Sequence, residues 1–382
     1  MSKAAYFLFF TFVESKNYIP NFKMKIAFII RSTLYSVPGG DTEQIVQTAK
    51  ALKKLGISVD ILATNAMIDY KKYDLFHFFN LNRPADILFH IGKIKKPFAV
   101  STILVDYSEY DKYHRKGLAG MILRLFPGNA NEYVKTVSRW LLRKDCLQSK
   151  SYLWKGQRKS IQAILSKASI LLPNSIGEYQ QLRELFGIEK PYAVIPNGVD
   201  PSLFIPDPFT PKDDSLVLCA ARIEGRKNQL NLIKAINNKP YKLLLTGLPA
   251  PNQKKYYREC KKSAAANIVF CGRVPIETLL DYYKKAKVHV LPSWHETCGL
   301  SSLEAAAMGC NIVITDRGFT REYFGEEAFY CEPGDIVSIF NAVDLAAQSS
   351  ISKRLQNKVR AEYTWEKAAA STLAAYKKII PG

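Results

Sequence analysis

The sequence predicts an α/β protein of two doubly wound domains that face each other across a cleft, and three observations support this fold class. The 382 residues exceed what one ordinary core holds and suit two domains of about 150–200 residues each. Short apolar strands alternate with amphipathic helices, which is typical of parallel sheets covered on both faces. This alternation stops near residue 195 and restarts near residue 212, after a segment with four prolines within thirteen residues.

In the first half, the pattern predicts five strands and a long helix. The helix, over 42–55, has Ile45, Ala49 and Leu52 on one face and ends at Gly56. Residues 1–23 are predicted to be an extension before a fold that begins at Met24, because no small-residue cleavage site follows their apolar run; a short membrane-touching segment is the alternative. The predicted strands are 26–30, 59–63, 75–79, 98–104 and 170–172.

The second half repeats the same alternation of strands and helices. Its predicted strands are 216–220, 242–246, 268–270, 288–291 and 312–314, and its predicted helices are 228–236, 275–286 and 300–308. The domain division that follows is an N-terminal domain 24–195 with a basic insertion 112–167, a proline-rich hinge 196–211, a C-terminal domain 212–360, and a C-terminal helix 361–382 that can cross back to the first domain.

Composition narrows the class of protein. The net charge of +20 favours an anionic partner. Apolar stretches stay shorter than the 18 or so residues that a membrane-spanning helix needs. Seven cysteines, an odd number without a CxxC pair, suggest reduced thiols in a cytoplasmic protein. Because neither half has GxGxxG after its first strand, a nicotinamide-dependent dehydrogenase is disfavoured.

Two adjacent glycines lie between the first strand and the first helix. Gly39 and Gly40 let the backbone approach a ligand closely, and the helix that follows offers free N–H groups and the positive end of its dipole. Both are therefore candidates for contacting a phosphate or a sugar. A plain tight turn is the alternative.

Two cations follow the first strand of the second half, at the carboxyl end where open parallel sheets bind ligands. Arg222 and Lys227 are five residues apart and can straddle a diphosphate, the arginine by bidentate contact and the lysine as a point charge. A solvated basic loop is the alternative.

Two glutamates flank the start of the helix at 300–308. Glu296 lies in the preceding loop, and Glu304 lies about one turn into the helix. Between them, the unpaired N–H groups of a helix start suit an anion. A nucleotide sugar has hydroxyl groups at both ends, which carboxylates can bind, and phosphates in the middle, which suit the anion site between them. A helix-start acid with an ordinary surface glutamate is the alternative.

These motifs together resemble the family-4 retaining glycosyltransferases. The resemblance rests on Gly39–Gly40, the Pro-Asn-Gly-Val-Asp segment at 196–200, Arg222 with Lys227, and Glu296-x7-Glu304 in a Pro-Ser…Gly-Leu…Glu-Ala setting. It spans roughly residues 25–330. It implies a GT-B fold of two Rossmann-like domains, and it implies transfer of a sugar from a nucleoside-diphosphate sugar to an acceptor hydroxyl with retention, without a metal or other cofactor.

The resemblance also implies roles for the donor site. Arg222 and Lys227 would hold the diphosphate, with Gly40 closing on it from the other domain. Glu296 would contact the sugar hydroxyls and Glu304 the ribose. The remaining implied donor contacts are the amides of Cys298, Gly299 and Leu300, which would face sugar and phosphate, and Arg273 with Val274 beside the base.

The acceptor side departs from the family pattern. Many relatives carry a histidine at the end of the strand that matches 98–104, whereas residues 101–106 here read Ser-Thr-Ile-Leu-Val-Asp. An aromatic residue usually precedes the glycine where this chain has Cys298. The acceptor-side candidates that remain are His77, expected at a strand end facing the cleft, and Asp106.

The basic insertion 112–167 holds thirteen Lys or Arg against two acidic residues, an excess of +11. Its apolar residues recur at helical spacing beside the cations. Since each cation near an anionic leaflet contributes about 1 kcal/mol, the segment predicts reversible docking on an anionic membrane. A solvated basic face packed by its apolar stripe is the alternative, and nucleic acid is not expected because no recognisable module is present. The stripe consists of Leu118, Met121, Ile122, Leu125 and Phe126.

The function predicted from these features is a cytoplasmic hexosyltransferase-type enzyme, peripheral on the inner face of the plasma membrane. Its partners would be a nucleoside-diphosphate sugar and a glycan or lipid-linked acceptor, in surface polysaccharide or lipid-linked glycan synthesis. Two alternatives stay open: a non-catalytic membrane- or polyanion-binding protein on the same scaffold, and a nucleotide-sugar epimerase.

Overall fold

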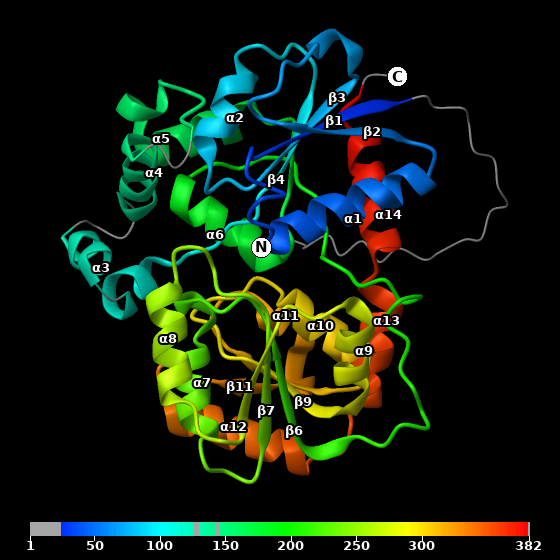
Figure 1. Ribbon diagram of the computed structural model, residues 1–382. Helices are drawn as coiled ribbons and strands as arrows, with labels where there is room; N and C mark the ends of the chain where they lie inside the picture. The colour runs from blue at the N-terminus through cyan, green and yellow to red at the C-terminus, as the bar shows by residue number, and fades with distance from the viewer. Residues whose placement is uncertain (1–23, 116, 126–129, 143–145, 381–382) are drawn as a thin grey trace, which may run out of the picture.

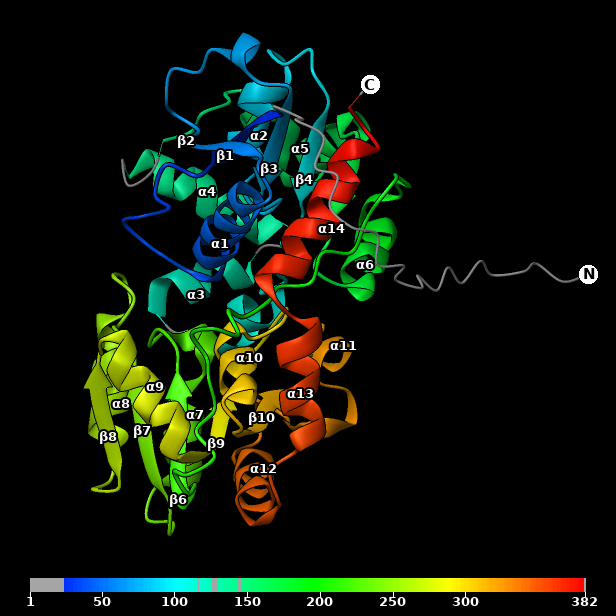
Figure 2. The same ribbon diagram turned by 90° about the vertical axis from the view of Figure 1, so that its right-hand side faces the viewer.

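The computed structural model describes residues 24–115, 117–125, 130–142 and 146–380 and consists of two lobes, each with a parallel sheet between layers of helices (Figures 1 and 2). The predicted fold class is therefore confirmed. The predicted extension 1–23 and Phe126 of the apolar stripe lie outside the described residues.

The N-terminal lobe contains a five-stranded sheet in the order β2-β1-β3-β4-β5, with all neighbours parallel. Its strands are β1 (Lys25–Ile30), β2 (Ser58–Ala63), β3 (Leu75–Phe79), β4 (Phe98–Ser101) and β5 (Ile170–Leu172). Its helices include α1 (Gly40–Lys54), α2 (Pro84–Ile91), α3 (Gly117–Arg124), α4 (Asn131–Leu141), α5 (Tyr152–Lys167) and α6 (Ile176–Phe186). All five predicted strands are present, and the predicted helix at 42–55 starts two residues earlier.

Strand β4 is shorter than predicted because a buried carboxylate turns the chain after Ser101. The Thr102 hydroxyl and the Leu104 N–H donate to Oε1 of Glu178 at 2.5 and 2.7 Å. Between them, Ile103 takes a φ of +42°, which a β-branched residue rarely adopts. The apolar run continues to residue 104, but these hydrogen bonds replace those of a strand.

The C-terminal lobe contains a six-stranded parallel sheet in the order β11-β10-β9-β6-β7-β8. Its strands are β6 (Asp213–Ala220), β7 (Lys242–Thr246), β8 (Ile268–Gly272), β9 (Ala286–Leu291), β10 (Asn311–Thr315) and β11 (Phe329–Cys331). Its helices are α7 (Gln229–Ile236), α8 (Lys254–Ser263), α9 (Ile276–Lys285), α10 (Leu300–Ala307), α11 (Thr320–Phe324), α12 (Ile336–Gln348) and α13 (Lys353–Glu362). Sequence analysis missed β11, α8, α11, α12 and α13.

The last helix, α14 (Trp365–Lys377), lies in the N-terminal lobe beside α1, whereas α13 lies with the C-terminal lobe (Figures 1 and 2). Trp365 and Tyr376 are buried in the same core as Phe28 of β1 and Ile45 of α1. The chain therefore crosses between the lobes twice, once near residue 198 and once near residue 364.

The two crossings are hydrogen-bonded to each other. The Val199 N–H donates to the Tyr363 carbonyl at 2.9 Å, and the Trp365 N–H donates to the Val199 carbonyl at 3.3 Å. A Cβ at Gly198 would lie 2.4 Å from the Thr364 carbonyl carbon, so this contact requires glycine. A movement of one lobe against the other would involve both crossings; the role of 196–211 as a hinge stays a prediction.

Candidate active site between the lobes

The loop that carries the predicted Gly39–Gly40 pair meets the C-terminal lobe at the carboxyl ends of its strands. Arg222 Nη1 donates to the Pro38 carbonyl at 3.2 Å. A Cβ built on Gly40 would lie 3.6 Å from Leu300 Cδ1, at the start of α10. Sequence-predicted residues 180 or more positions apart in the chain thus line one interface.

The loop after β6 holds three charged side chains in contact. Glu224 is buried and accepts from Arg222 Nη2 at 3.2 Å and from Arg226 Nη2 at 3.1 Å. Burial works to raise the pKa of Glu224, but the cations around it lower that pKa overall. The carboxylate therefore stays ionised and orients Arg222 toward the interface. Glu224 and Arg226 were not predicted as site residues.

The predicted pair of Lys227 and Glu296 forms a direct ion pair, to which the Ser293 hydroxyl adds a hydrogen bond of 2.7 Å to the same Oε1. Burial works to lower the pKa of the Lys227 ammonium, but the Glu296 carboxylate outweighs it and holds that pKa above its usual value. This ion pair joins the loop after β6 to the loop after β9. An ammonium in this setting stays charged for an incoming anion.

Glu304 lies on α10, where the Tyr283 hydroxyl donates to its Oε2 at 2.9 Å. Burial raises the pKa of Glu304 to about 7, against the lowering effect of that hydrogen bond, and the charge of Glu43 on α1 of the other lobe raises it further. Near neutral pH the carboxyl group is thus partly protonated and can both donate and accept hydrogen bonds.

The residue before α10 is Gly299, with a φ of +64°. A Cβ there would lie 2.9 Å from Ile314 Cδ1 as well, so both backbone and packing favour glycine. Cys298 is buried and its thiol accepts from Asn197 Nδ2 at 3.3 Å. Its side chain therefore packs inside the lobe, and its contribution to a ligand would come from its backbone.

Arg273 and Val274 directly follow β8, the edge strand of the sheet, and Arg273 is exposed. They lie at the same sheet edge as the other residues of the C-terminal lobe, two strands from β6. Their assignment to the base of a nucleotide remains a prediction.

The expectation that His77 faces the cleft is wrong. His77 is fully buried in the N-terminal lobe, where Nδ1 pairs with the Tyr376 hydroxyl at 2.6 Å and Nε2 with the Ser101 hydroxyl at 2.9 Å. Its ring also stacks on Phe79. Burial lowers the pKa of His77 to about 3. It joins α14 to β3 and has no ring nitrogen available for an acceptor.

Residues 106–114, here called the cross-lobe segment, were not predicted as a unit. Tyr107 lies under the Arg226 guanidinium, 4.4 Å from ring centroid to Cζ. Glu109 Oε2 accepts from Arg317 Nη1 at 2.6 Å, and His114 stacks on Trp294 with centroids 3.5 Å apart. The predicted candidate Asp106 begins this segment and is exposed. The sequence feature that could have indicated this segment is the regular spacing of its tyrosines, in Asp-Tyr-Ser-Glu-Tyr-Asp-Lys-Tyr-His.

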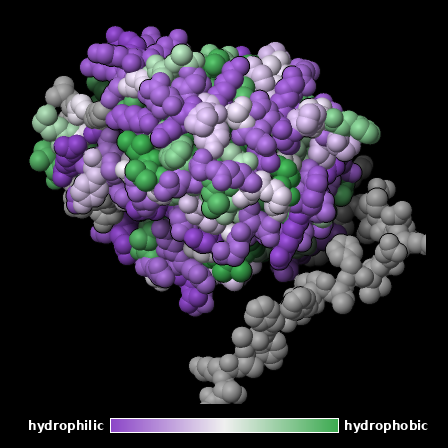
Figure 3. Space-filling model, turned by 90° about the horizontal axis from the view of Figure 1, so that it is seen from below, coloured by the Kyte–Doolittle hydropathy of each residue, from purple (hydrophilic) through white to green (hydrophobic). Residues whose placement is uncertain are grey.

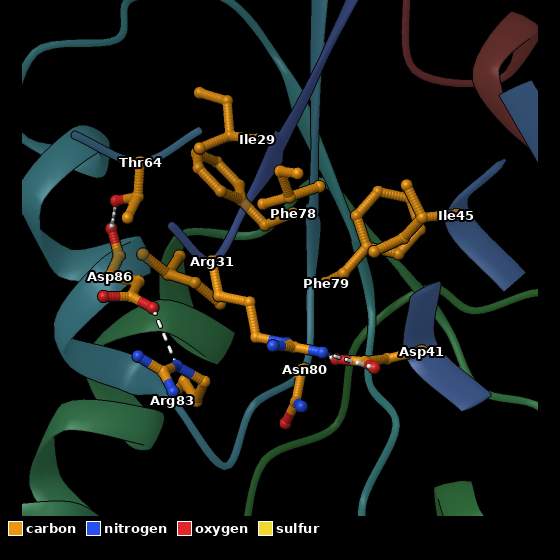
Figure 4. A pocket seen from close by; sticks show the side chains of 12 residues that line it. Ile29, Arg31, Asp41, Ile45, Thr64, Phe78, Phe79, Asn80, Arg83 and Asp86 are labelled. Atoms are coloured by element: carbon orange, nitrogen blue, oxygen red, sulfur yellow. Dashed lines mark hydrogen bonds and ion pairs between the residues drawn. The ribbon is translucent and has the colours of Figure 1, made fainter. Parts of the chain in front are cut away.

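A small pocket lined by apolar and charged side chains lies at the carboxyl ends of β1 and β3 (Figure 4). Arg31 donates to both carboxylate oxygens of Asp41 at 2.7 and 3.0 Å and to the Val37 carbonyl at 2.9 Å. Burial works to raise the pKa of Asp41, and the Arg31 guanidinium lowers it overall. Arg31 therefore holds the Gly39–Gly40 loop in place. In the part of the chain that the structure describes, no group of three or more His, Cys, Asp or Glu could hold a metal ion.

The comparisons with known proteins agree with this geometry. Residues 203–362 match the family described as glycosyl transferases group 1. The chain is 27% identical over 243 residues to a D-inositol 3-phosphate glycosyltransferase of Geodermatophilus obscurus, covering 56% of this chain and 54% of that protein. It is 25% identical over 166 residues to O-antigen chain mannosyltransferase B of Escherichia coli, covering 41% and 44%. The chain thus spans about half the length of the curated relatives it matches.

Solved structures with the same arrangement cover nearly the whole chain. Sucrose-phosphate synthase from Thermosynechococcus elongatus superposes with a TM-score of 0.73 at 18% identity, covering 93% of this chain and 99% of that one. Anabaena HepE in complex with UDP and glucose superposes with a TM-score of 0.66 at 14% identity, covering 93% and 100%. At such identities the likeness shows the fold alone, and it confirms the predicted GT-B architecture.

Proposed function

We propose that this chain, whose residues 203–362 match the glycosyl transferases group 1 family, is a retaining glycosyltransferase that uses a nucleoside-diphosphate sugar. The observation that carries this proposal is the position of the Lys227–Glu296 ion pair. The pair joins the loop that carries Arg222 to the loop that leads into α10, and the Pro38–Gly40 loop of the other lobe contacts Arg222 and Leu300. Paired cations, a helix start and a carboxylate are what a sugar diphosphate requires.

In the proposed reaction, the bond between the anomeric carbon and the diphosphate oxygen breaks as the bond to the acceptor oxygen forms on the same face, and the proton of the acceptor hydroxyl passes to the leaving diphosphate oxygen. Negative charge develops on the leaving diphosphate, where Arg222, Lys227 and the N–H groups of α10 stabilise it. Lys227 exchanges part of its contact with Glu296 for the phosphate, which leaves Glu296 to accept hydrogen bonds from the sugar hydroxyls. Closure of the lobes excludes water and so limits hydrolysis of the donor.

We assign the acceptor to surface polysaccharide or lipid-linked glycan synthesis. Two of the similar curated proteins are named for such work, an O-antigen chain mannosyltransferase and a lipopolysaccharide core mannosyltransferase of Rhizobium leguminosarum. The basic insertion supports the same assignment, since a lipid-linked acceptor is reached at a membrane surface.

The surface around α3–α5 fits docking on an anionic membrane. Met121, Leu125 and Trp154 are 60, 79 and 72% exposed, and Leu141 and Leu142 are also exposed. Arg115 and Lys135 pair with Asp111, so they add little to docking. Exposed cations of this region are Lys112, Arg124, Lys150, Lys155, Arg158, Lys159 and Lys167.

Two further observations bear on this surface. Exposed apolar residues cluster around α3–α5, whereas the lower end of the C-terminal lobe shows them scattered among hydrophilic residues (Figure 3). Across the described part of the chain, no helix has both the length and the apolar character needed to cross a bilayer. The contact that we propose on α3–α5 is a reversible one.

The activity is tested with purified protein, a panel of nucleotide sugars and simple glycoside acceptors. Arg222→Ala should lower transfer steeply while leaving the melting temperature close to that of the wild type. Arg321→Ala is the matched control, because that arginine lies on the surface of α11. Turnover of the donor without any acceptor would instead favour an epimerase, and binding of liposomes without turnover would favour a non-catalytic protein.

Membrane contact is tested by sedimentation with vesicles of phosphatidylglycerol and phosphatidylcholine. Binding should require the anionic lipid, fall with added salt, and weaken in the Leu141→Ser/Leu142→Ser variant. Phe209→Ser is the matched control, since Phe209 is a highly exposed apolar residue far along the chain from the insertion. Equal binding to neutral vesicles, or no binding, would contradict the proposal.

A further inference from the structure

His295 is a polar side chain at the interface to which the reaction proposed above assigns no role. It lies in the loop after β9, directly before Glu296, and is partly exposed. Its Nδ1 is buried and has no hydrogen-bond partner among the residues that the structure describes. A buried imidazole nitrogen without a partner is unfavourable, and a ligand that supplies the missing hydrogen bond relieves it.

Groups from both lobes surround His295. Its ring packs edge-on against Tyr107 of the cross-lobe segment and against Phe319 of its own lobe, with centroids 6.2 and 5.9 Å away. Burial lowers its pKa, while the nearby carboxylates of Asp106 and Glu296 raise it and the ammonium of Lys227 lowers it. Asp106 belongs to the N-terminal lobe and directly precedes Tyr107, whose ring contacts His295 across the interface.

His289 shows why this environment matters. It also has a buried ring nitrogen without a partner among the described residues, but it lies inside β9 and is wholly enclosed by the core, with Nδ1 3.3 Å from the Ser302 hydroxyl. A ligand cannot reach it. His295 differs because it lies between the lobes, beside the Lys227–Glu296 pair.

We propose that His295 and Asp106 bind the acceptor, one from each lobe, and that the acceptor ends in a sugar or another polyol. This inference rests on the proposed function. The carboxylate of Asp106 would repel a diphosphate, so this side of the interface does not suit the donor's charged part. Two neighbouring hydroxyl groups suit this side, since one can donate to the Asp106 carboxylate and the other can form a hydrogen bond with the His295 imidazole. The two residues bind and orient the acceptor and take no part in breaking the donor bond.

The test compares kinetic constants for acceptor and donor, using methyl glycosides as acceptor probes and the nucleotide sugar that the wild-type enzyme turns over. His295→Ala should raise the acceptor KM roughly tenfold or more, with the donor KM and the slow hydrolysis of donor within about twofold. Asp106→Asn should do the same to a smaller degree. His295→Asn, whose amide can take the place of Nδ1, should recover part of the loss.

His114→Phe is the matched control, because it keeps a ring against Trp294 in the same cross-lobe segment. It should leave the acceptor KM unchanged. An unchanged acceptor KM in His295→Ala, or an equal rise in the donor KM, would overturn the inference while donor turnover still upheld the proposed function. A wild-type protein without donor turnover or hydrolysis would overturn both.

Discussion

The two edges of the interface differ in how their side chains are arranged. On the C-terminal lobe, Arg222 and Lys227 are already held by buried carboxylates, Glu224 and Glu296. On the N-terminal lobe, the edge offers the backbone of the Gly39–Gly40 loop and the cross-lobe segment 106–114. The first edge is a fixed charge arrangement that suits one invariant group, a diphosphate. The second is a surface of loops, which suits a partner that varies between related enzymes.

Among the changes that test this difference between the edges, removal of the Lys227 charge should have the largest effect. Lys227→Met is expected to lower kcat/KM for the donor by roughly 100- to 1,000-fold, because it removes a preorganised charge from the leaving group. Steady-state kinetics measure it, and circular dichroism checks the fold. Loss of Lys227 leaves the buried Glu296 carboxylate without its ion-pair partner, so Lys227→Met/Glu296→Gln serves as the control for stability. Near-normal transfer in either variant would contradict the proposal that the cations of the C-terminal lobe bind the diphosphate.

His77 distinguishes a core residue from a cleft residue in the N-terminal lobe. His77→Ala removes the hydrogen bonds to Tyr376 and Ser101 and leaves a cavity between α14 and β3. We expect a loss of roughly 2–4 kcal/mol in the free energy of unfolding, measured with urea, and an unchanged acceptor KM below the melting temperature. A stable variant with a raised acceptor KM would return His77 to the acceptor site.

Glu304 should make stability depend on pH. Its pKa is raised to about 7 by burial, above the ordinary value of 4.5 that it takes on unfolding. The folded state therefore holds the proton more tightly, and the stability present below pH 4.5 is lost as pH rises toward 7, by at most about 3 kcal/mol. Glu304→Gln should remove this loss, so its melting temperature should exceed that of the wild type more at pH 8 than at pH 5.

The control for that titration is Glu326→Gln, a change at a highly exposed carboxylate. It should shift the melting temperature equally at both pH values. A Glu304→Gln variant that behaves in the same way would show that Glu304 is hydrated and ionised in the folded protein.

The ion pair between Glu109 and Arg317 should have the smallest effect. Its side chains are 43 and 40% exposed, and Arg317 also pairs with Glu332. Glu109→Gln is therefore expected to change the free energy of unfolding by less than about 1 kcal/mol. A loss above about 2 kcal/mol in urea denaturation would mean that the cross-lobe segment, and not the two chain crossings, holds the lobes together.

The sequence predicted the C-terminal edge of the interface better than the N-terminal edge for a physical reason. Arg222, Lys227, Glu296 and Glu304 follow strands of one sheet, so their order along the chain nearly determines their place at its edge. The cross-lobe segment depends on a turn that Glu178 imposes after β4, from a helix over 70 residues further on. His77 was misplaced because strand alternation does not reveal that α14 returns to cover it.

The central claim is that a nucleoside diphosphate binds where Arg222, Lys227 and the start of α10 meet. It is tested most directly by the melting temperature of the wild type and of Lys227→Met with millimolar UDP, GDP or ADP. The account predicts that at least one nucleotide raises the melting temperature of the wild type by several degrees and that of Lys227→Met hardly at all, because a ligand stabilises the native state by mass action. Equal shifts in both proteins, or no shift with any of the three, would contradict it.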